Sequence, residues 1–128
     1  MIKTLEKNRI IPSIITLLIT AEIFYFSSLT GGTLGTGNIW ISRAYHFIVF
    51  FLFSFFFFIV IKGREKIKIK HLLIVLIVSI THAFLDEFHQ SFVPGRNPDI
   101  QDILTDLSGI FSSIIIYKTT IRMAKTKR

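Results

Sequence analysis

The sequence predicts an all-α integral membrane protein, a bundle of four transmembrane helices in a single domain covering residues 1–128. Hydrophobic residues make up 51% of the chain and the mean hydropathy is +0.60, values that favour a membrane protein over a soluble domain. The apolar residues are collected into four runs, each long enough at ~1.5 Å per residue to cross most of a ~30 Å hydrocarbon layer. The runs are continuous rather than alternating, which argues against a membrane β-barrel.

The first run covers residues 10–29. It has a basic start, but it contains Glu22 and lacks a small-x-small cleavage site, so we expect a retained helix rather than a signal peptide. The second run, residues 44–61, is rich in phenylalanine and carries His46 near its start. The third and fourth helices are predicted at about 72–90 and 103–121, and both contain several ionisable residues.

The basic residues alternate with uncharged connections along the chain. Lysines and arginines gather before the first run, in the loop at 62–70 and after the fourth run, whereas residues 30–42 carry no charge. By the positive-inside rule, both termini and the 62–70 loop are expected in the cytoplasm, and the two other connections outside. The net charge of +7 therefore reflects topology rather than nucleic-acid binding. The absence of cysteine excludes disulfides, thiolate metal sites and a cysteine nucleophile.

The polar residues of the spans fall near the predicted outer surface. Ionisable groups at this depth cost about 2–3 kcal/mol each and are functional by default. His82, Asp86 and His89 lie at i, i+4 and i+7 and share one helix face with Gln90, whereas Glu87 is about 100° round that helix. We therefore expect Glu87 to face another neighbour.

The fourth run continues this pattern. Asp102 and Asp106 are one turn apart, and Gly109 and Ser113 extend the same stripe with a small-residue spacing that permits close helix contact. We expect the third and fourth helices to pack as a hairpin on which the carboxylates and imidazoles converge.

The connection between these helices contains two chain breaks. Pro94-Gly95 predicts a tight turn, and Asn97-Pro98 a second break before the fourth helix. Asp99 is the predicted N-cap of that helix. Arg96 and the free N–H groups of the helix start then suit a phosphate or a carboxylate.

These residues resemble a known family. "DEFHQSFVPGR" (86–96) followed by "DILTDLSG" (102–109) resembles the signature of the VanZ-like membrane proteins, and "IFYFSS" (23–28) and "RAYHF" (43–47) are weaker matches in the same order. Two positions depart from the family pattern: Asp106 stands where asparagine is common, and Ser113 where a second glycine is common.

The resemblance implies a multi-pass protein of the bacterial plasma membrane with four helices. The founding member of the family is associated with resistance to the glycopeptide antibiotic teicoplanin. The family has no settled biochemical activity, so the resemblance indicates fold and location better than chemistry.

The leading functional hypothesis is an outward-facing polar site that binds or acts on a cell-envelope lipid, a lipid-linked wall intermediate or a glycopeptide antibiotic, contributing to resistance. A carboxylate paired with histidine can serve as a general base. The candidate catalytic residues are Asp86, Glu87, His89 and Asp102. The candidate substrate-binding residues are Gln90, Arg96, Asp106 and His46.

Two alternatives stay open beside this hypothesis. His82, Asp86, His89 and Asp102 can instead hold a divalent metal ion, since mixed histidine and carboxylate sets suit zinc or manganese, although no H-E-x-x-H motif is present. The protein can also be a non-catalytic binding or exclusion protein, or a structural one whose polar cluster only locks the helices. The expected partners are the lipid bilayer, a lipid headgroup or lipid-linked wall intermediate, and further copies in an oligomer, but no nucleic acid.

Overall fold

The computed structural model describes residues 2–30 and 38–126, with side chains through Met123. The described residues are helical or irregular and form no strand, which confirms the all-α prediction. Four of the helices are long and apolar enough to cross a membrane. The helices are α1 (Ile2–Lys7), α2 (Ile10–Ser27), α3 (Ile39–Lys62), α4 (Ile69–Gln90) and α5 (Ile100–Thr126).

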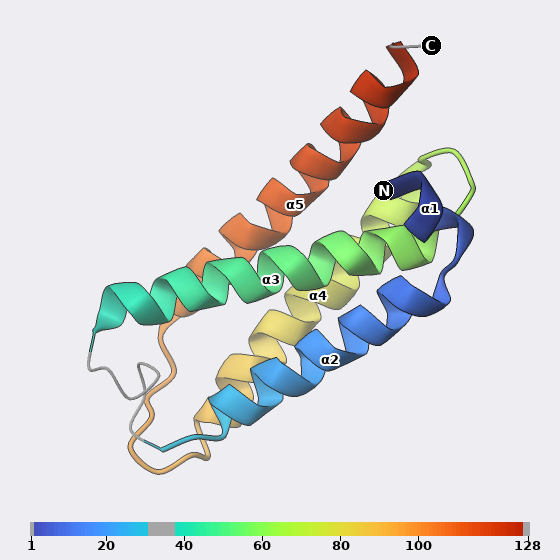
Figure 1. Ribbon diagram of the computed structural model, residues 1–128. Coiled ribbons are helices and arrows are strands. Elements are labelled where there is room, and N and C mark those ends of the chain that lie inside the picture. The colour runs from blue at the N-terminus through green and yellow to red at the C-terminus, as the bar shows by residue number, and fades with distance from the viewer. Residues whose placement is uncertain (1, 31–37, 127–128) are drawn as a thin grey trace.

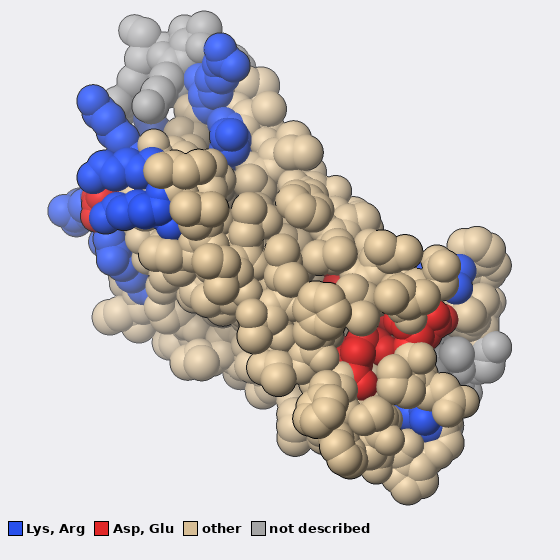
Figure 2. Space-filling model, turned by 180° about the vertical axis from the view of Figure 1, so that it is seen from behind, with Lys and Arg blue, Asp and Glu red and all other residues tan. Residues whose placement is uncertain are grey.

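The four long helices alternate in direction (Figure 1). The end of α2, the start of α3 and the connection from α4 to α5 lie at one end of the bundle, which we call the site end. Helix α1, the connection from α3 to α4 and the last turns of α5 lie at the opposite end, which we call the basic end. Figure 2 shows most lysines and arginines over the basic end, and aspartates and glutamates gathered toward the site end.

Three helices begin earlier than the apolar runs predict: α4 begins at Ile69 rather than at 72, and capping side chains extend α3 and α5 beyond the apolar residues. The Asn38 side chain accepts a hydrogen bond from the Trp40 N–H at 2.9 Å, so α3 begins at Ile39 rather than at 44. Asp99 Oδ1 accepts from the Gln101 N–H at 2.9 Å, so α5 begins at Ile100 rather than at 103. Asp99 thus caps α5, as the sequence predicts.

The small-residue stripe of α5 serves a different neighbour from the expected one. Helix α5 contacts α4, but its most extensive packing is against α3. Gly109 is buried there, and a Cβ atom at this position would lie 2.5 Å from the Phe47 carbonyl oxygen. The close approach that glycine permits is therefore between α5 and α3, and it brings the first two turns of α5 against the start of α3.

A valine at Gly109 is expected to destabilise the bundle by about 1–3 kcal/mol, since its side chain would push α5 away from the α3 backbone. The measurement is thermal unfolding in detergent micelles. Ser108→Val is the matched control, because Ser108 is exposed on the neighbouring position and valine there meets no helix. Equal melting temperatures for the two variants would contradict the α3–α5 contact.

Three buried polar side chains hold the basic end together, and the sequence patterns do not predict their contact. Glu6 Oε1 lies 2.8 Å from Lys62 Nζ and accepts a hydrogen bond from the Tyr117 hydroxyl at 2.5 Å. All three side chains are buried, and they come from α1, α3 and α5. Helix α1 thus anchors the start of the chain to two of the membrane-spanning helices.

Candidate functional site

A histidine from α3 and two aspartates from α5 form the centre of the site. His46 is 4% exposed and Asp106 is fully buried. His46 Nδ1 lies 3.0 Å from Asp106 Oδ1, and His46 Nε2 lies 3.8 Å from Asp102 Oδ2. Asp102 and Asp106 are one turn apart and both reach His46, so the predicted shared face of these two residues is the face that meets α3. Each nitrogen of the imidazole ring therefore has a carboxylate near it.

Helix α4 adds two buried carboxylates to the same place. One ligand atom each from His46, Asp86 and Glu87 lie within 4.8 Å of one another. The sequence predicts Glu87 on another face from Asp86, but both side chains reach this site because α4 packs against both α3 and α5. Glu87 Oε2 also accepts a hydrogen bond from the Asp99 N–H at 2.9 Å, which connects it to the start of α5.

Arg96 connects the site to the end of α2 by hydrogen bonds. It donates hydrogen bonds to Gln90 Oε1 at 3.2 Å, to the Phe26 carbonyl at 2.8 Å and to the Leu29 carbonyl at 3.3 Å. The two carbonyls lie at the C-terminus of α2, where backbone acceptors lack helical partners and a cation is favourable. Gln90 in turn donates to Asp86 Oδ2 at 3.0 Å. Arg96, Gln90 and Asp86 therefore form one hydrogen-bonded chain leading into the site.

The turn that places Arg96 has the predicted form. The Arg96 N–H donates to the Val93 carbonyl at 3.1 Å, closing a four-residue turn around Pro94 and Gly95. Gly95 has φ +78°, the value that the third residue of a type II turn requires, and only glycine adopts it without cost. The turn directs the Arg96 side chain back toward α2 and Gln90.

Several buried oxygens around the site have no hydrogen-bond partner among the described residues. Three of them belong to carboxylates: Glu87 Oε1, Asp102 Oδ1 and Asp106 Oδ2. The Tyr45 hydroxyl and Ser27 Oγ are in the same condition, and both residues line a cavity of about 10 Å³ beside His46 and Asp86. This space is about the size that one water molecule occupies. The site thus has acceptor capacity that its own side chains do not use.

Two of the predicted histidines lie apart from this centre. His82 is half-buried and packs against the rings of Phe50 and Phe53, at centroid distances of 5.5 and 4.6 Å. His89 packs on the Phe24 ring, and its Nε2 lies 3.0 Å from Ser28 Oγ. Their spacing places both histidines along α4 with Asp86. However, the His82 ring contacts phenylalanines of α3, and the His89 ring contacts the end of α2.

The set of residues whose geometry suits a metal therefore differs from the predicted one. Among the described residues, the group that can present three ligand atoms to one ion is His46, Asp86 and Glu87. It shares only Asp86 with the set that the sequence suggests, which is His82, Asp86, His89 and Asp102.

Sequence reasoning assigned no site role to two residues of α3. Tyr45 lines the cavity, and Arg43 Nη2 lies 4.0 Å from Asp99 Oδ2 while its guanidinium stands 5.5 Å from the Trp40 ring centroid. The sequence signal for the inner side of α3 is the spacing of Ser42, His46, Val49 and Phe53, at i, i+4, i+7 and i+11. All four residues are buried. This spacing identifies the inner face of α3 and the side of the helix on which a site can form.

The arrangement favours ligands that donate hydrogen bonds or carry positive charge. Four carboxylates surround one imidazole, and Arg96 is already engaged by Gln90 and two carbonyls. A histidine held between two carboxylates can also accept a proton from a bound hydroxyl or amine. The site can therefore bind a donor-rich group, hold a cation or act as a base.

One family model matches the sequence. The model is described as VanZ/LLP1 and matches residues 4–122, which is nearly the whole chain. No curated protein and no solved structure matches the chain.

Proposed function

The chain belongs to the VanZ/LLP1 family, and we propose that it is a bacterial envelope protein whose site-end cluster binds or acts on an envelope ligand. The ligand classes are those that the sequence suggests: an envelope lipid, a lipid-linked wall intermediate or a glycopeptide antibiotic. We include in this proposal that the protein contributes to resistance to glycopeptide antibiotics.

The observation that carries this proposal is the set of unpartnered carboxylate oxygens on Glu87, Asp102 and Asp106. A network that only locks helices is expected to satisfy its own buried groups, because each unsatisfied one costs free energy. Acceptors that are left over favour a ligand that reaches them with one small hydroxyl or amine group, because these oxygens are buried and the cavity beside His46 and Asp86 is about the size of one water molecule. Sugar-bearing wall intermediates and glycopeptides carry both kinds of donor, and so do many lipid headgroups.

Within this proposal the residues divide the work. Asp86, Glu87 and Asp102 accept hydrogen bonds from the ligand, while His46 and Asp106 form the pair that takes up a proton if the ligand is turned over. Gln90 and Arg96 hold Asp86 in place. His89 stands beside Ser28, near the end of α2, where it contacts the part of the ligand that extends beyond the bundle.

Direct binding tests this function. Purified protein in lipid nanodiscs is titrated with a lipid-linked wall intermediate and, separately, with teicoplanin. Saturable binding to at least one of them is expected, with loss in Asp86→Asn and no change in Glu65→Gln, whose carboxylate lies at the basic end. Failure of both ligands to bind, or equal losses in the two variants, would contradict the proposal.

We also propose that the site end faces outward and the basic end the cytoplasm, because the positive-inside rule places Lys- and Arg-rich connections in the cytoplasm. The chain has no cysteine, so single-cysteine labelling is clean. Ser91→Cys is expected to react with a membrane-impermeant maleimide in intact cells. Lys66→Cys is expected to react only after permeabilisation, and both residues are exposed. The reverse pattern would invert the topology.

A divalent metal ion is a second candidate ligand, favoured by the three converging ligand atoms of His46, Asp86 and Glu87. If zinc or manganese binds there, one ion per chain is expected by elemental analysis after dialysis, and His46→Ala abolishes it. His82→Ala separates the two possible ligand sets. It retains the ion if the structural set is correct, and loses it if the sequence-based set is correct.

A further inference from the structure

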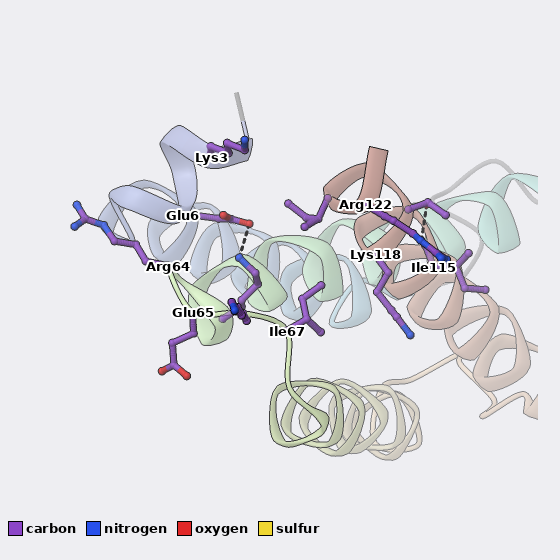
Figure 3. Close-up of a pocket in the computed structure, with 12 residues that line it drawn as sticks. Lys3, Glu6, Arg64, Glu65, Ile67, Ile115, Lys118 and Arg122 are labelled. Carbon is purple, nitrogen blue, oxygen red and sulfur yellow. Dashed lines mark hydrogen bonds and ion pairs between the residues drawn. The ribbon is translucent and has the colours of Figure 1, made fainter. Parts of the chain in front are cut away.

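A second cavity lies at the basic end, far from the site described above. It has a volume of about 890 Å³ and opens between α1, the connection after α3 and the C-terminal half of α5. In Figure 1 the last turns of α5 diverge from the other helices, and residues of these turns line the cavity. Figure 3 shows Lys3 and Glu6 on one side of this groove, and Ile115, Lys118 and Arg122 on α5 opposite them.

Basic and aliphatic side chains line the groove together. Three isoleucines line it, at positions 67, 115 and 121. The basic residues that line it are Lys3, Lys62, Arg64, Lys66, Lys118 and Arg122. A surface of this kind matches an amphiphile whose polar part is negatively charged.

The two acidic residues of the lining do not cancel this charge. Glu6 is paired with Lys62 at 2.8 Å inside the bundle. Glu65 is held by Lys68 at 3.0 Å and Lys70 at 3.6 Å, two lysines outside the groove. The hydrogen bond and charge of Lys68 lower the pKa of Glu65, so this carboxylate remains ionised and engaged with them. Lys3, Lys66 and Lys118 have no ion pair among the described residues and keep their charge for a ligand.

We propose that this groove binds one anionic phospholipid, with its headgroup among the basic side chains of the lining and the first part of an acyl chain along the three isoleucines. The groove lies at the end of the apolar spans of α3 and α5, which is the depth of lipid headgroups in a bilayer. The surface of an anionic leaflet attracts such basic groups. A lipid at this position would fill the space between α1 and α5 and support the diverging end of α5.

The test is native mass spectrometry of the full-length protein released from detergent, titrated with phosphatidylglycerol or phosphatidylcholine. One phosphatidylglycerol per chain is expected, bound in preference to phosphatidylcholine. Lys3→Gln combined with Lys118→Gln is expected to weaken binding about 30-fold, the loss for two basic groups removed from an anionic surface. Lys3→Arg with Lys118→Arg keeps both charges and is expected to retain binding.

The matched control is Lys7→Gln with Arg9→Gln, which removes two charges from the same end but outside the groove and leaves both lysine partners of Glu65 in place. Retained binding in this control supports a defined site, whereas an equal loss would overturn the proposal in favour of diffuse surface charge. Equal binding of phosphatidylcholine would overturn the role of charge. Displacement of the lipid by glycerol phosphate at equal concentration would show a site for a free anion instead. Unfolding midpoints without lipid should agree among the variants, because all the substituted residues are exposed.

Discussion

Alanine in place of Lys62 is expected to lower the free energy of unfolding by about 3–5 kcal/mol, the usual cost of removing one partner of a buried ion pair. Glu6 would then be buried between α1, α3 and α5 without its cation, with only the Tyr117 hydroxyl as a partner. The measurement is unfolding of the purified protein in mixed micelles with increasing denaturing detergent.

Two further variants control this experiment. Lys68→Ala removes an exposed ion pair with Glu65, and it is expected to leave the unfolding midpoint almost unchanged. Glu6→Gln in the Lys62→Ala background removes the stranded charge and should restore part of the lost stability. If Lys62→Ala behaved like Lys68→Ala, the contact between α1 and α3 could not be a buried pair.

Alanine in place of Arg96 is expected to cost about 3 kcal/mol of stability, since hydrogen bonds from a charged donor are strong and Gln90 Oε1 would lose the donor that the structure gives it. Gln90 and the Phe26 and Leu29 carbonyls all accept from this one side chain. The loss would also release Gln90, so binding of the envelope ligand should weaken along with stability. Thermal unfolding and the binding titration measure the two effects.

Lysine at Arg96 is the control for this second prediction. It keeps the positive charge but cannot donate in three fixed directions at once, so we expect an intermediate loss of stability. Unchanged stability in Arg96→Ala combined with complete loss of binding would contradict the structural role that the three hydrogen bonds of Arg96 indicate. That result would instead favour the interpretation of Arg96 as a direct ligand contact.

Much of the fold follows from local patterns. The four apolar runs predict the four long helices, the Pro94-Gly95 pair predicts the turn, and Asp99 predicts the cap of α5. These features depend on neighbours in the sequence. Helix α1 was not predicted, because its six residues are too few and too polar to produce an apolar pattern.

The sequence predicts less well which residues form the site, and the reason is geometrical. Periodicity shows which residues share a face of one helix, but it does not show which neighbour that face meets. His82 and His89 share a side of α4 with Asp86, yet Phe53 and Ser28 are their contacts. Glu87 was expected on a different face, and it reaches His46 because α4 packs against two helices at once.

The pairing of Glu6 with Lys62 shows the same limit at the basic end. Each residue belongs to a segment whose charge is explained by topology alone, and only the packed bundle brings the two together.

The most direct test of the central claim is to measure the stability and ligand binding of one variant, Asp102→Asn. Asp102 Oδ1 has no partner among the described residues. Asparagine keeps the shape of this side chain and reduces the neighbouring carboxyl groups from four to three, so burying the cluster costs less free energy. If the cluster is a ligand site, the variant should unfold at the same or a higher temperature than the unmodified protein and should lose binding of the wall intermediate or teicoplanin. A parallel fall in melting temperature and binding would show instead that the carboxylates serve to hold the helices together.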